Sequence, residues 1–240
     1  MLKVIFFDAA GTLFKPRERV GATYTRIARG YGVDASAAQV HDAFRRVFGG
    51  APGLAFGPGH DAAELRVLER RWWRDLVAAS FAGLGTFTNF DDYFDELFAF
   101  FADPSNWRPD PQAEQALAHL RAAGFDLGMV SNFDYRLYRI VAGLGLTRHF
   151  ASITISSEAG YAKPAPEIFR IALAKHGITA AEAMHVGDVE QLDIAGALGA
   201  GIPAILLDPA ATEPLRREGR SARANSLAAV VDAARQGRFP

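Results

Sequence analysis

An aspartate at the end of an apolar run is the first feature of this chain that could do chemistry. Asp8 directly follows Val4-Ile5-Phe6-Phe7, a run that predicts a strand buried on both faces. The small residues and Gly-Thr turn of DAAGT come next. A carboxylate at the end of a buried strand is costly to desolvate unless something uses it. Taken alone, Asp8 is better explained as a turn residue or a helix cap, so the residues at the other strand ends decide whether it has a chemical role.

Other strand-like runs also end on polar residues. Ser131 and Asn132 end the run FDLGMVSN, and Asp188 ends AMHVGD. Lys163 stands directly before Pro164 and a helical pattern. Since parallel strands bring their carboxyl ends to one edge, we expect one crevice to hold Asp8, Thr12, Ser131, Asn132, Lys163, Asp188 and Asp193. Acids, a cation and small donors together favour metal-assisted phosphoryl transfer.

The elements that must position these residues alternate between two types. Strands are predicted at 2–7, 125–132, 152–156, 183–188 and 201–208. Helices are predicted at 111–124, 135–145, 165–177 and 189–201, with a last helix that begins after Ser226 as its N-cap. This alternation predicts an α/β fold: a doubly wound, Rossmann-like parallel sheet covered on both faces.

Residues 16–109 lack strand-like runs. Helical patterns occupy 21–32, 36–48, 61–83 and 89–104, and a Gly/Pro-rich loop spans 49–59. We therefore predict a catalytic core of residues 1–15 and 110–240, with an inserted all-helical cap of residues 16–109. The insert leaves from the carboxyl end of the first strand, so it should cover the site as a lid.

Composition restricts the partners. The net charge is −1, and the chain has no cysteine and no apolar run long enough for a membrane span. We expect a cytoplasmic protein that is a monomer or homodimer and binds a small phosphorylated molecule, with neither nucleic acid nor membrane as a partner.

Four motifs carry a family resemblance. DAAGT, VSN, the lysine before a proline, and GDVEQLD resemble, in order and spacing, the motifs of the haloacid dehalogenase superfamily of hydrolases. They cover roughly residues 1–15 and 110–240, and the helical insert is similar to that superfamily's four-helix-type cap. RRWW and SNFDYRL most resemble its haloacid dehalogenase-like hydrolase domain-containing group.

The resemblance implies a magnesium-dependent phosphatase. Asp8 would attack phosphorus and become an aspartyl phosphate. Asp8, Asp188 and the backbone carbonyl of Ala10 would ligate Mg²⁺.

The remaining motif residues take supporting roles by the same resemblance. Ser131 and the backbone near Asn132 would hold phosphate oxygens. Lys163 would offset the charge between Asp8 and phosphate, and Asp193 would orient Lys163 or a metal-bound water. Thr12 would bond to the loop backbone or to the site.

Ala10 departs from the phosphatase pattern, which has a second, acid/base Asp at this place. Three explanations stay open. The leaving group needs no proton, as in an acyl phosphate. The cap supplies the acid/base, with His41 and His60 as candidates. Or the protein is catalytically impaired and only binds a phosphate-bearing ligand.

Two other activities of the superfamily also do without that acid. A metal-independent 2-haloacid dehalogenase is one alternative, although Asp188 would repel the substrate carboxylate. A phosphonoacetaldehyde hydrolase needs a cap lysine, for which Lys15 is the one candidate.

Several other side chains are assigned structural roles. His185 is predicted to be a core histidine, and Trp72 and Trp73 cap core. The arginines of the third helix are predicted to form a solvated face paired with Glu64 and Glu69: Arg66, Arg70, Arg71 and Arg74. Substrate choice is expected to depend on residues around Phe14, Lys15 and Arg17 and on the loop at 49–59.

Overall fold

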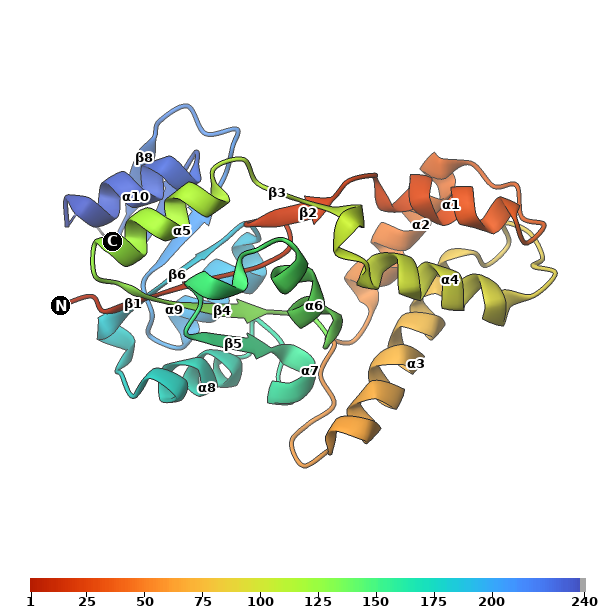
Figure 1. Cartoon of the computed structure of the whole chain (residues 1–240), viewed down its shortest axis with the longest axis horizontal. Coiled ribbons are helices and arrows are strands. Elements are labelled where there is room, and N and C mark those ends of the chain that lie inside the picture. The colour runs from red at the N-terminus through yellow and green to blue at the C-terminus, as the bar shows by residue number, and fades with distance from the viewer. Residues whose placement is uncertain (238–240) are drawn as a thin grey trace.

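A single large sheet organises the computed structural model, which describes residues 1–237. Its strand order is β5-β4-β1-β6-β7-β9-β8 (Figure 1). The strands are β5 (Ser152–Ile155), β4 (Asp126–Ser131), β1 (Val4–Phe7), β6 (Ala183–Gly187), β7 (Ala204–Leu207), β9 (Ser221–Ala224) and β8 (Leu215–Glu218). All neighbours pair in parallel except β8 and β9. The predicted α/β class with a parallel sheet is confirmed.

Strand β1 lies where the chain changes direction across the sheet. From β1 the chain builds β4 and β5 on one side, and then β6 and β7 on the other. Phe7 is in register with Met129 of β4 and Val186 of β6. Ligands of such sheets bind at this switch point, outside the carboxyl ends of the strands. Asp8 follows β1 and so lies at that point.

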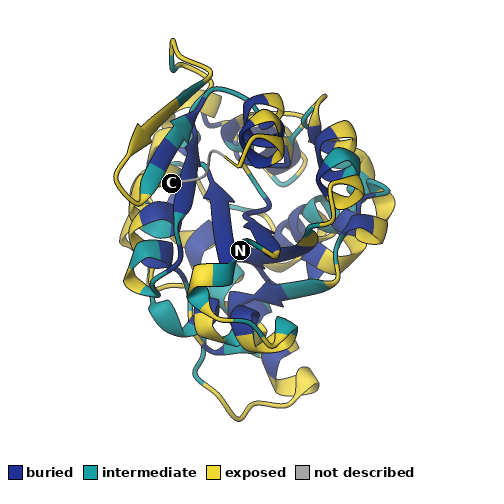
Figure 2. Cartoon of the chain, turned by 90° about the vertical axis from the view of Figure 1, so that its left-hand side faces the viewer, coloured by how far each residue is buried: buried dark blue, intermediate teal, exposed yellow. Residues whose placement is uncertain are grey.

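Helices cover both faces of the sheet (Figures 1 and 2). Ile5 and Phe7 belong to one apolar cluster and Val4 and Phe6 to another, as the alternation of a strand requires. The first cluster includes residues of α5 (Ala113–Ala122), α6 (Arg136–Gly143) and α10 (Leu227–Arg235). The second includes residues of α8 (Pro166–His176) and α9 (Ala195–Gly199). Ser226 is the N-cap of α10, as predicted, and accepts the N–H of Ala229.

Four helices and no strand lie between residues 20 and 102, which we call the helical segment. They are α1 (Val20–Arg29), α2 (Ala37–Gly50), α3 (Ala62–Ser80) and α4 (Phe90–Ala102). They have an apolar cluster of their own and lie beside the sheet, at the carboxyl end of β1 (Figure 1). Short antiparallel strands, β2 (Phe14–Pro16) and β3 (Trp107–Pro109), make the two connections. The exact domain bounds at 15/16 and 109/110 stay a prediction.

Some elements escaped the sequence analysis. Strands β2, β3, β8 and β9 have three or four residues each, too few for a clear alternation. The helix predicted at 189–201 is a π-helical turn at Glu190–Ile194 followed by α9. A one-turn helix, α7 (Ser156–Ala159), follows β5. Within residues 1–237, no helix is both long and apolar enough to cross a membrane.

Candidate active site

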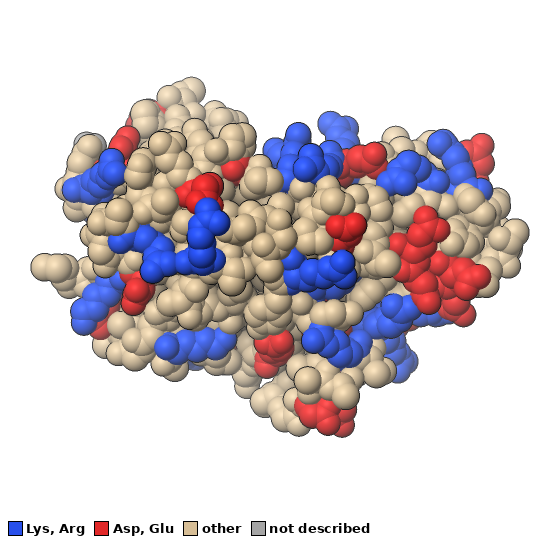
Figure 3. All heavy atoms as spheres, in the orientation of Figure 1, with Lys and Arg blue, Asp and Glu red and all other residues tan. Residues whose placement is uncertain are grey.

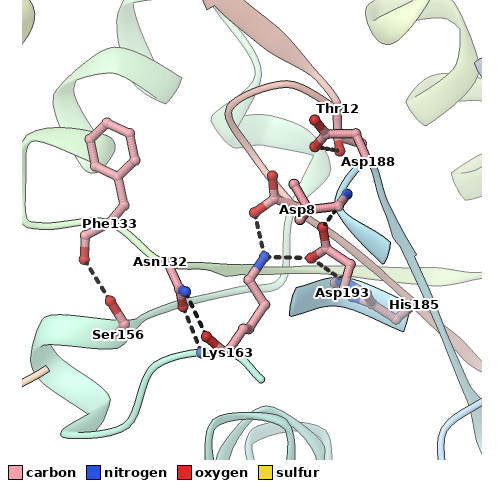
Figure 4. Close-up of polar contacts among 10 residues, drawn as sticks. Asp8, Thr12, Asn132, Phe133, Ser156, Lys163, His185, Asp188 and Asp193 are labelled. Carbon is pink, nitrogen blue, oxygen red and sulfur yellow. Dashed lines mark hydrogen bonds and ion pairs between the residues drawn. The ribbon is translucent and has the colours of Figure 1, made fainter. Parts of the chain in front are cut away.

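Three side chains from separate segments meet in a buried ion cluster (Figure 4): Asp8 directly follows β1, Lys163 lies in the loop between α7 and α8, and Asp193 lies in the π-helical turn after β6. Lys163 Nζ donates to Asp8 Oδ1 at 2.5 Å and to Asp193 Oδ1 at 2.6 Å. The exposed fraction is 7% for Asp8, 4% for Lys163 and 1% for Asp193, so water screens these charges poorly. The structure brings these three residues together at the sheet edge, as predicted.

The surroundings shift the pKa values of the two carboxylates in this cluster in opposite directions. Burial raises the pKa of Asp8 to about 6, although the Lys163 charge opposes the rise. Burial acts in the same direction on Asp193, but there Lys163 and His185 outweigh it and hold the pKa of Asp193 below its ordinary range. Lys163 stays protonated, because the two carboxylates overcome the effect of burial and raise its pKa. Asp8 is therefore the more basic of the two carboxylates.

Asp193 uses both of its oxygens within the protein. Oδ1 also lies 3.0 Å from His185 Nε2, and Oδ2 accepts the N–H of Val189 at 3.0 Å. The carboxylate lies against Gly187, where a Cβ would come within 2.2 Å of Asp193 Cγ. With its oxygens occupied, Asp193 orients Lys163, in keeping with the expected supporting role.

His185 is buried in the core as predicted, but it also supports the site. The sequence analysis missed its contact with Asp193. One signal was available: the alternation of β6 puts positions 185 and 187 on one face. On that face His185 provides a polar partner, and Gly187, which has no side chain, leaves the space that the Asp193 carboxylate fills.

Asp188 stands beside the loop that follows Asp8. Thr12 Oγ1 donates to Asp188 Oδ1 at 2.9 Å, which gives Thr12 a defined partner. Gly11 has φ +112°, and a Cβ there would lie 2.3 Å from Asp188 Oδ2. Only glycine permits this backbone and this close approach. Burial, the largest influence, raises the pKa of Asp188.

Asp8, Asp188 and Asp193 form the acidic group that could hold a metal. One carboxylate oxygen of each lies within 4.8 Å of the others. Three carboxylates face the one positive charge of Lys163, so the cluster has an excess of negative charge. Carboxylate oxygens are the ligands that Mg²⁺ prefers, and a divalent cation would offset that excess. Because Asp193 is fully engaged, Asp8 and Asp188 are the carboxylates that fit an ion.

Asn132 holds the loop that contains Lys163 in place. Its Nδ2 donates to the Lys163 carbonyl at 2.9 Å, and its Oδ1 accepts the Lys163 N–H at 2.7 Å. The side chain thus positions Lys163, while phosphate binding by the backbone near Asn132 stays a prediction. Ser131 ends β4 and is 2% exposed. Its predicted contact with phosphate also stays a prediction.

Comparison with known proteins decides the family. A model of the haloacid dehalogenase-like hydrolases matches residues 2–201. This chain belongs to the haloacid dehalogenase-like hydrolase family. It is 33% identical over 228 residues to haloacid dehalogenase-like hydrolase domain-containing protein 3 of Bos taurus, which covers 90% of this chain and 88% of that protein. The predicted family is thus confirmed, and the protein is an enzyme, a hydrolase.

Two further comparisons concern a related enzyme and a related structure. The hydrolase is 32% identical over 224 residues to a phosphoserine phosphatase of Thermus thermophilus, which covers 86% of this chain and 89% of that one. The crystal structure of L-2-haloacid dehalogenase from Xanthobacter autotrophicus superposes with a TM-score of 0.69 at 20% identity, over 98% of this chain and 99% of that one. The second likeness shows a shared fold.

The two sequence signals RRWW and SNFDYRL of this hydrolase contact each other. Trp73 Nε1 donates to Asp134 Oδ2 at 2.6 Å. Asp134 also binds Arg136 through two side-chain hydrogen bonds, of 2.9 and 2.6 Å, and both residues are buried. The Arg136 guanidinium lies 3.8 Å from the centre of the Phe98 ring in α4. This group joins the helical segment to the residues directly after Asn132.

The prediction that Trp72 and Trp73 belong to the cap core is confirmed only in part. Both are half-buried; Trp73 packs against the apolar cluster of the helical segment, and Trp72 packs against Trp73 and Phe48. Trp72 Nε1 donates to the Pro52 carbonyl in the Gly/Pro-rich loop, and Trp73 reaches Asp134. Their polar N–H groups make edge positions more favourable than a dry interior.

The predicted pairing of the arginines with Glu64 and Glu69 is wrong. The acidic start of α4 lies across from α3, so Arg70 pairs with Asp95 and Arg74 with Asp91. Figure 3 shows acidic and basic side chains next to each other on the surface of the helical segment. Arg66 lies 3.4 Å from the centre of the Tyr135 ring, and Arg71 approaches Asp75 at 3.8 Å.

Glu69, by contrast, is buried at the junction with the core. Its exposed fraction is 1%, and its Oε1 accepts the N–H of Tyr135 at 3.3 Å. Burial raises the pKa of Glu69. Glu64 instead completes the capping box of α3 with Asp61.

The Gly/Pro-rich loop packs on the segment that leads to Lys163. The Leu54 carbonyl accepts Ser156 Oγ at 2.6 Å. A Cβ on Gly160 would meet the backbone of Gly57 at 2.5 Å. This contact places the loop beside the carboxyl end of β5, and its expected part in substrate choice stays a prediction.

None of the candidate replacements for the missing acid contacts the ion cluster. His60 bonds to Glu64 and the Phe56 carbonyl, while His41 lies on α2 against Gly21. Lys15, the lysine that a phosphonoacetaldehyde hydrolase would need, is exposed on β2, opposite Arg108 of β3. Phe14, expected near the substrate, is instead buried against Trp107.

Proposed function

We propose that this hydrolase is a Mg²⁺-dependent phosphatase of a small phosphorylated molecule, with Asp8 as its nucleophile. The observation that carries the proposal is the excess of carboxylates around Lys163 at the switch point of the sheet. The likeness to a phosphatase of Thermus thermophilus supports the same reaction. We further propose a cytoplasmic monomer or homodimer whose helical segment serves as the cap.

The residues of this chain divide the reaction between them. Asp8 Oδ2, the oxygen that Lys163 does not contact, attacks phosphorus, and the bond to the leaving oxygen breaks with its electron pair on that oxygen. Lys163 holds Asp8 and offsets the charge that accumulates as two anions approach. Water then attacks the aspartyl phosphate, which frees Asp8 and phosphate. Bound Mg²⁺ would be held by Asp8 and Asp188 and would stabilise charge on the phosphoryl oxygens.

Ala10 favours one competing function. A metal-independent dehalogenase also needs no acid at this position, because a halide leaves without a proton. Asp188 opposes that function, since a second carboxylate 4.8 Å or less from Asp8 would repel a haloacid carboxylate. A protein that binds a phosphate-bearing ligand without turnover is the third alternative.

Phosphate release from acetyl phosphate, with Mg²⁺ or with EDTA, tests the proposal. We expect release that stops with EDTA and falls by at least about 10³-fold in Asp8→Asn. Halide release from a 2-haloacid that ignores EDTA would establish the dehalogenase instead. Binding of a phosphate analogue with no release would leave only the binding function.

A further inference from the structure

The Gly/Pro-rich loop of the helical segment lies along the part of the core that leads to Lys163, residues 156–162, which we call the approach segment. The carbonyl of Leu54 accepts the hydroxyl of Ser156 at 2.6 Å, where the approach segment begins. A Cβ on Gly53 would come within 2.8 Å of the Cβ of Ala162, where the approach segment ends. The loop therefore contacts both ends of the approach segment.

The same loop is bonded to other residues of the helical segment. Trp72 Nε1, on α3, donates to the Pro52 carbonyl at 3.0 Å. His60 Nε2 lies 3.0 Å from the Phe56 carbonyl, and because a carbonyl can only accept, the ring nitrogen donates. These bonds fix the loop on both sides of Leu54 in the sequence. The loop is therefore a fixed link between the helical segment and the approach segment.

Ser156 joins this link to the core. Its hydroxyl is fully buried and has two backbone carbonyls within reach, that of Leu54 at 2.6 Å and that of Phe133 at 3.4 Å. Figure 4 shows the second of these contacts. A hydroxyl has one proton to donate, and the shorter contact is the stronger hydrogen bond. The proton of Ser156 is therefore directed at the loop, and it turns to Phe133 when the loop moves away.

Lys163 depends on its backbone for its place in the ion cluster. A lysine side chain is a long flexible stem, so Nζ meets Asp8 and Asp193 only where the backbone is fixed. Asn132, the neighbour of Phe133, fixes the backbone of Lys163 itself through two hydrogen bonds, of 2.9 and 2.7 Å. The approach segment fixes the chain that enters Lys163, and the loop supports the approach segment.

We infer that the Gly/Pro-rich loop holds Lys163 in the ion cluster, and that Ser156 is the positioning residue that carries this effect. Loss of the Ser156 hydroxyl leaves the buried Leu54 carbonyl without its donor and loosens the loop from the approach segment. Lys163 then leaves Asp8 more often. The consequence for the reaction rests on the proposed phosphatase function, whereas the position of Lys163 does not.

Trace acetylation of lysines measures how often Lys163 leaves the cluster. An activated acetyl ester modifies amines that reach solvent: Lys163 is 4% exposed, whereas the Lys3 side chain is 60% exposed and serves as the reference within each sample. We expect Ser156→Ala to raise the labelling of Lys163 relative to Lys3 by about tenfold, read by mass spectrometry after digestion. Ser80→Ala is the matched control, because that hydroxyl is also fully buried and donates to a backbone carbonyl, that of Leu76, at 2.8 Å. It should lower the thermal stability as much and leave Lys163 protected.

Gly53→Ala tests the other end of the approach segment, and it decides the question if Ser156→Ala does not fold. The new Cβ would clash with Ala162, so the loop must shift. We expect the same rise in the labelling of Lys163. Gly50→Ala, three residues earlier, meets nothing within 4 Å and should leave the labelling unchanged. Labelling of Lys163 that stays at the wild-type level in either folded variant, or that rises equally in the controls, would overturn the inference.

Phosphate release from acetyl phosphate tests what the position of Lys163 means for the reaction. We expect kcat to fall by about tenfold in Ser156→Ala and Gly53→Ala, with KM within about twofold, because Lys163 offsets charge that grows in the transition state. Increased labelling of Lys163 with an unchanged kcat would overturn Ser156 as a positioning residue. A wild type that releases no phosphate would refute the proposed function instead, and the labelling would still decide whether the loop holds Lys163.

Discussion

The strand-end site and the junction with the helical segment both bury charges, but they balance them differently. At the strand ends, Lys163 faces Asp8, Asp193 and Asp188. At the junction, Asp134 and Arg136 neutralise each other. A balanced buried pair fixes geometry and can be replaced by apolar residues, whereas an unbalanced cluster needs a charge from outside. The unbalanced cluster at the strand ends therefore suits a charged ligand, whereas the balanced pair at the junction suits a contact between the helical segment and the core.

Removal of Lys163 should have the largest effect. Lys163→Met leaves Asp8 and Asp193 buried without their cation, so we expect the free energy of unfolding to fall by about 3–5 kcal/mol. Phosphate release should fall by at least about 10³-fold. Urea unfolding and a phosphate assay measure both. Lys175→Met, at an exposed lysine that bonds the Ile153 carbonyl, should cost under about 1 kcal/mol. Equal effects of the two variants would contradict the assigned role.

The junction should tolerate loss of the pair better than loss of one partner. Asp134→Asn strands a buried Arg136, and we expect it to cost about 3 kcal/mol in urea unfolding. The double variant Asp134→Leu with Arg136→Met removes both charges and should recover part of that loss, because the N–H of Trp73 still loses its acceptor. Asp95→Asn breaks an exposed pair and should cost under about 1 kcal/mol. A double variant as unstable as the single one would show that these charges do more than fix geometry.

Magnesium should stabilise the strand-end cluster. At an Mg²⁺ concentration 100 times its dissociation constant, the free energy of unfolding should rise by about 2.7 kcal/mol. Asp188→Asn should lose this gain in thermal unfolding. Asp126→Asn, at the opposite end of β4, should keep it. A gain that persists in Asp188→Asn would place the ion elsewhere.

Restoring the missing acid should alter the reaction selectively. We expect Ala10→Asp to raise kcat for an alkyl phosphate by at least about tenfold, because the new carboxyl protonates the alkoxide. Hydrolysis of acetyl phosphate should change little. The ratio of the two rates is the measurement, and an unchanged ratio would refute our explanation of Ala10.

The smallest effect concerns Glu69. The raised pKa of Glu69 means that folding disfavours its ionised form. The free-energy cost of burying Glu69 therefore grows as pH rises above 4.5, the ordinary pKa of a glutamate. Glu69→Gln keeps an oxygen acceptor for Tyr135 without the charge. It should match the wild type below pH 4.5 and be slightly more stable at pH 7.5. Glu213→Gln, at an exposed position, should show no such trend in thermal unfolding.

The sequence could predict what depends on local pattern. Apolar runs ending on polar residues indicated the large strands and the residues at their carboxyl edge, but not the order of the strands in the sheet. His185 was placed in the core, but its contact with Asp193 depends on the space beside Gly187. Trp73 and Asp134 lie 61 residues apart, and no periodicity links them. Contacts between the helical segment and the core depend on how two units dock, which local pattern does not encode.

Mass spectrometry of Asp8 tests the central claim most directly. The protein is incubated with acetyl phosphate, with Mg²⁺ or with EDTA, quenched in acid and digested. We predict a phosphoryl group on the peptide that contains Asp8, present with Mg²⁺ and absent with EDTA and in Asp8→Asn. Steady phosphate release with Asp8 never labelled, even in rapidly quenched samples, would contradict Asp8 as the nucleophile.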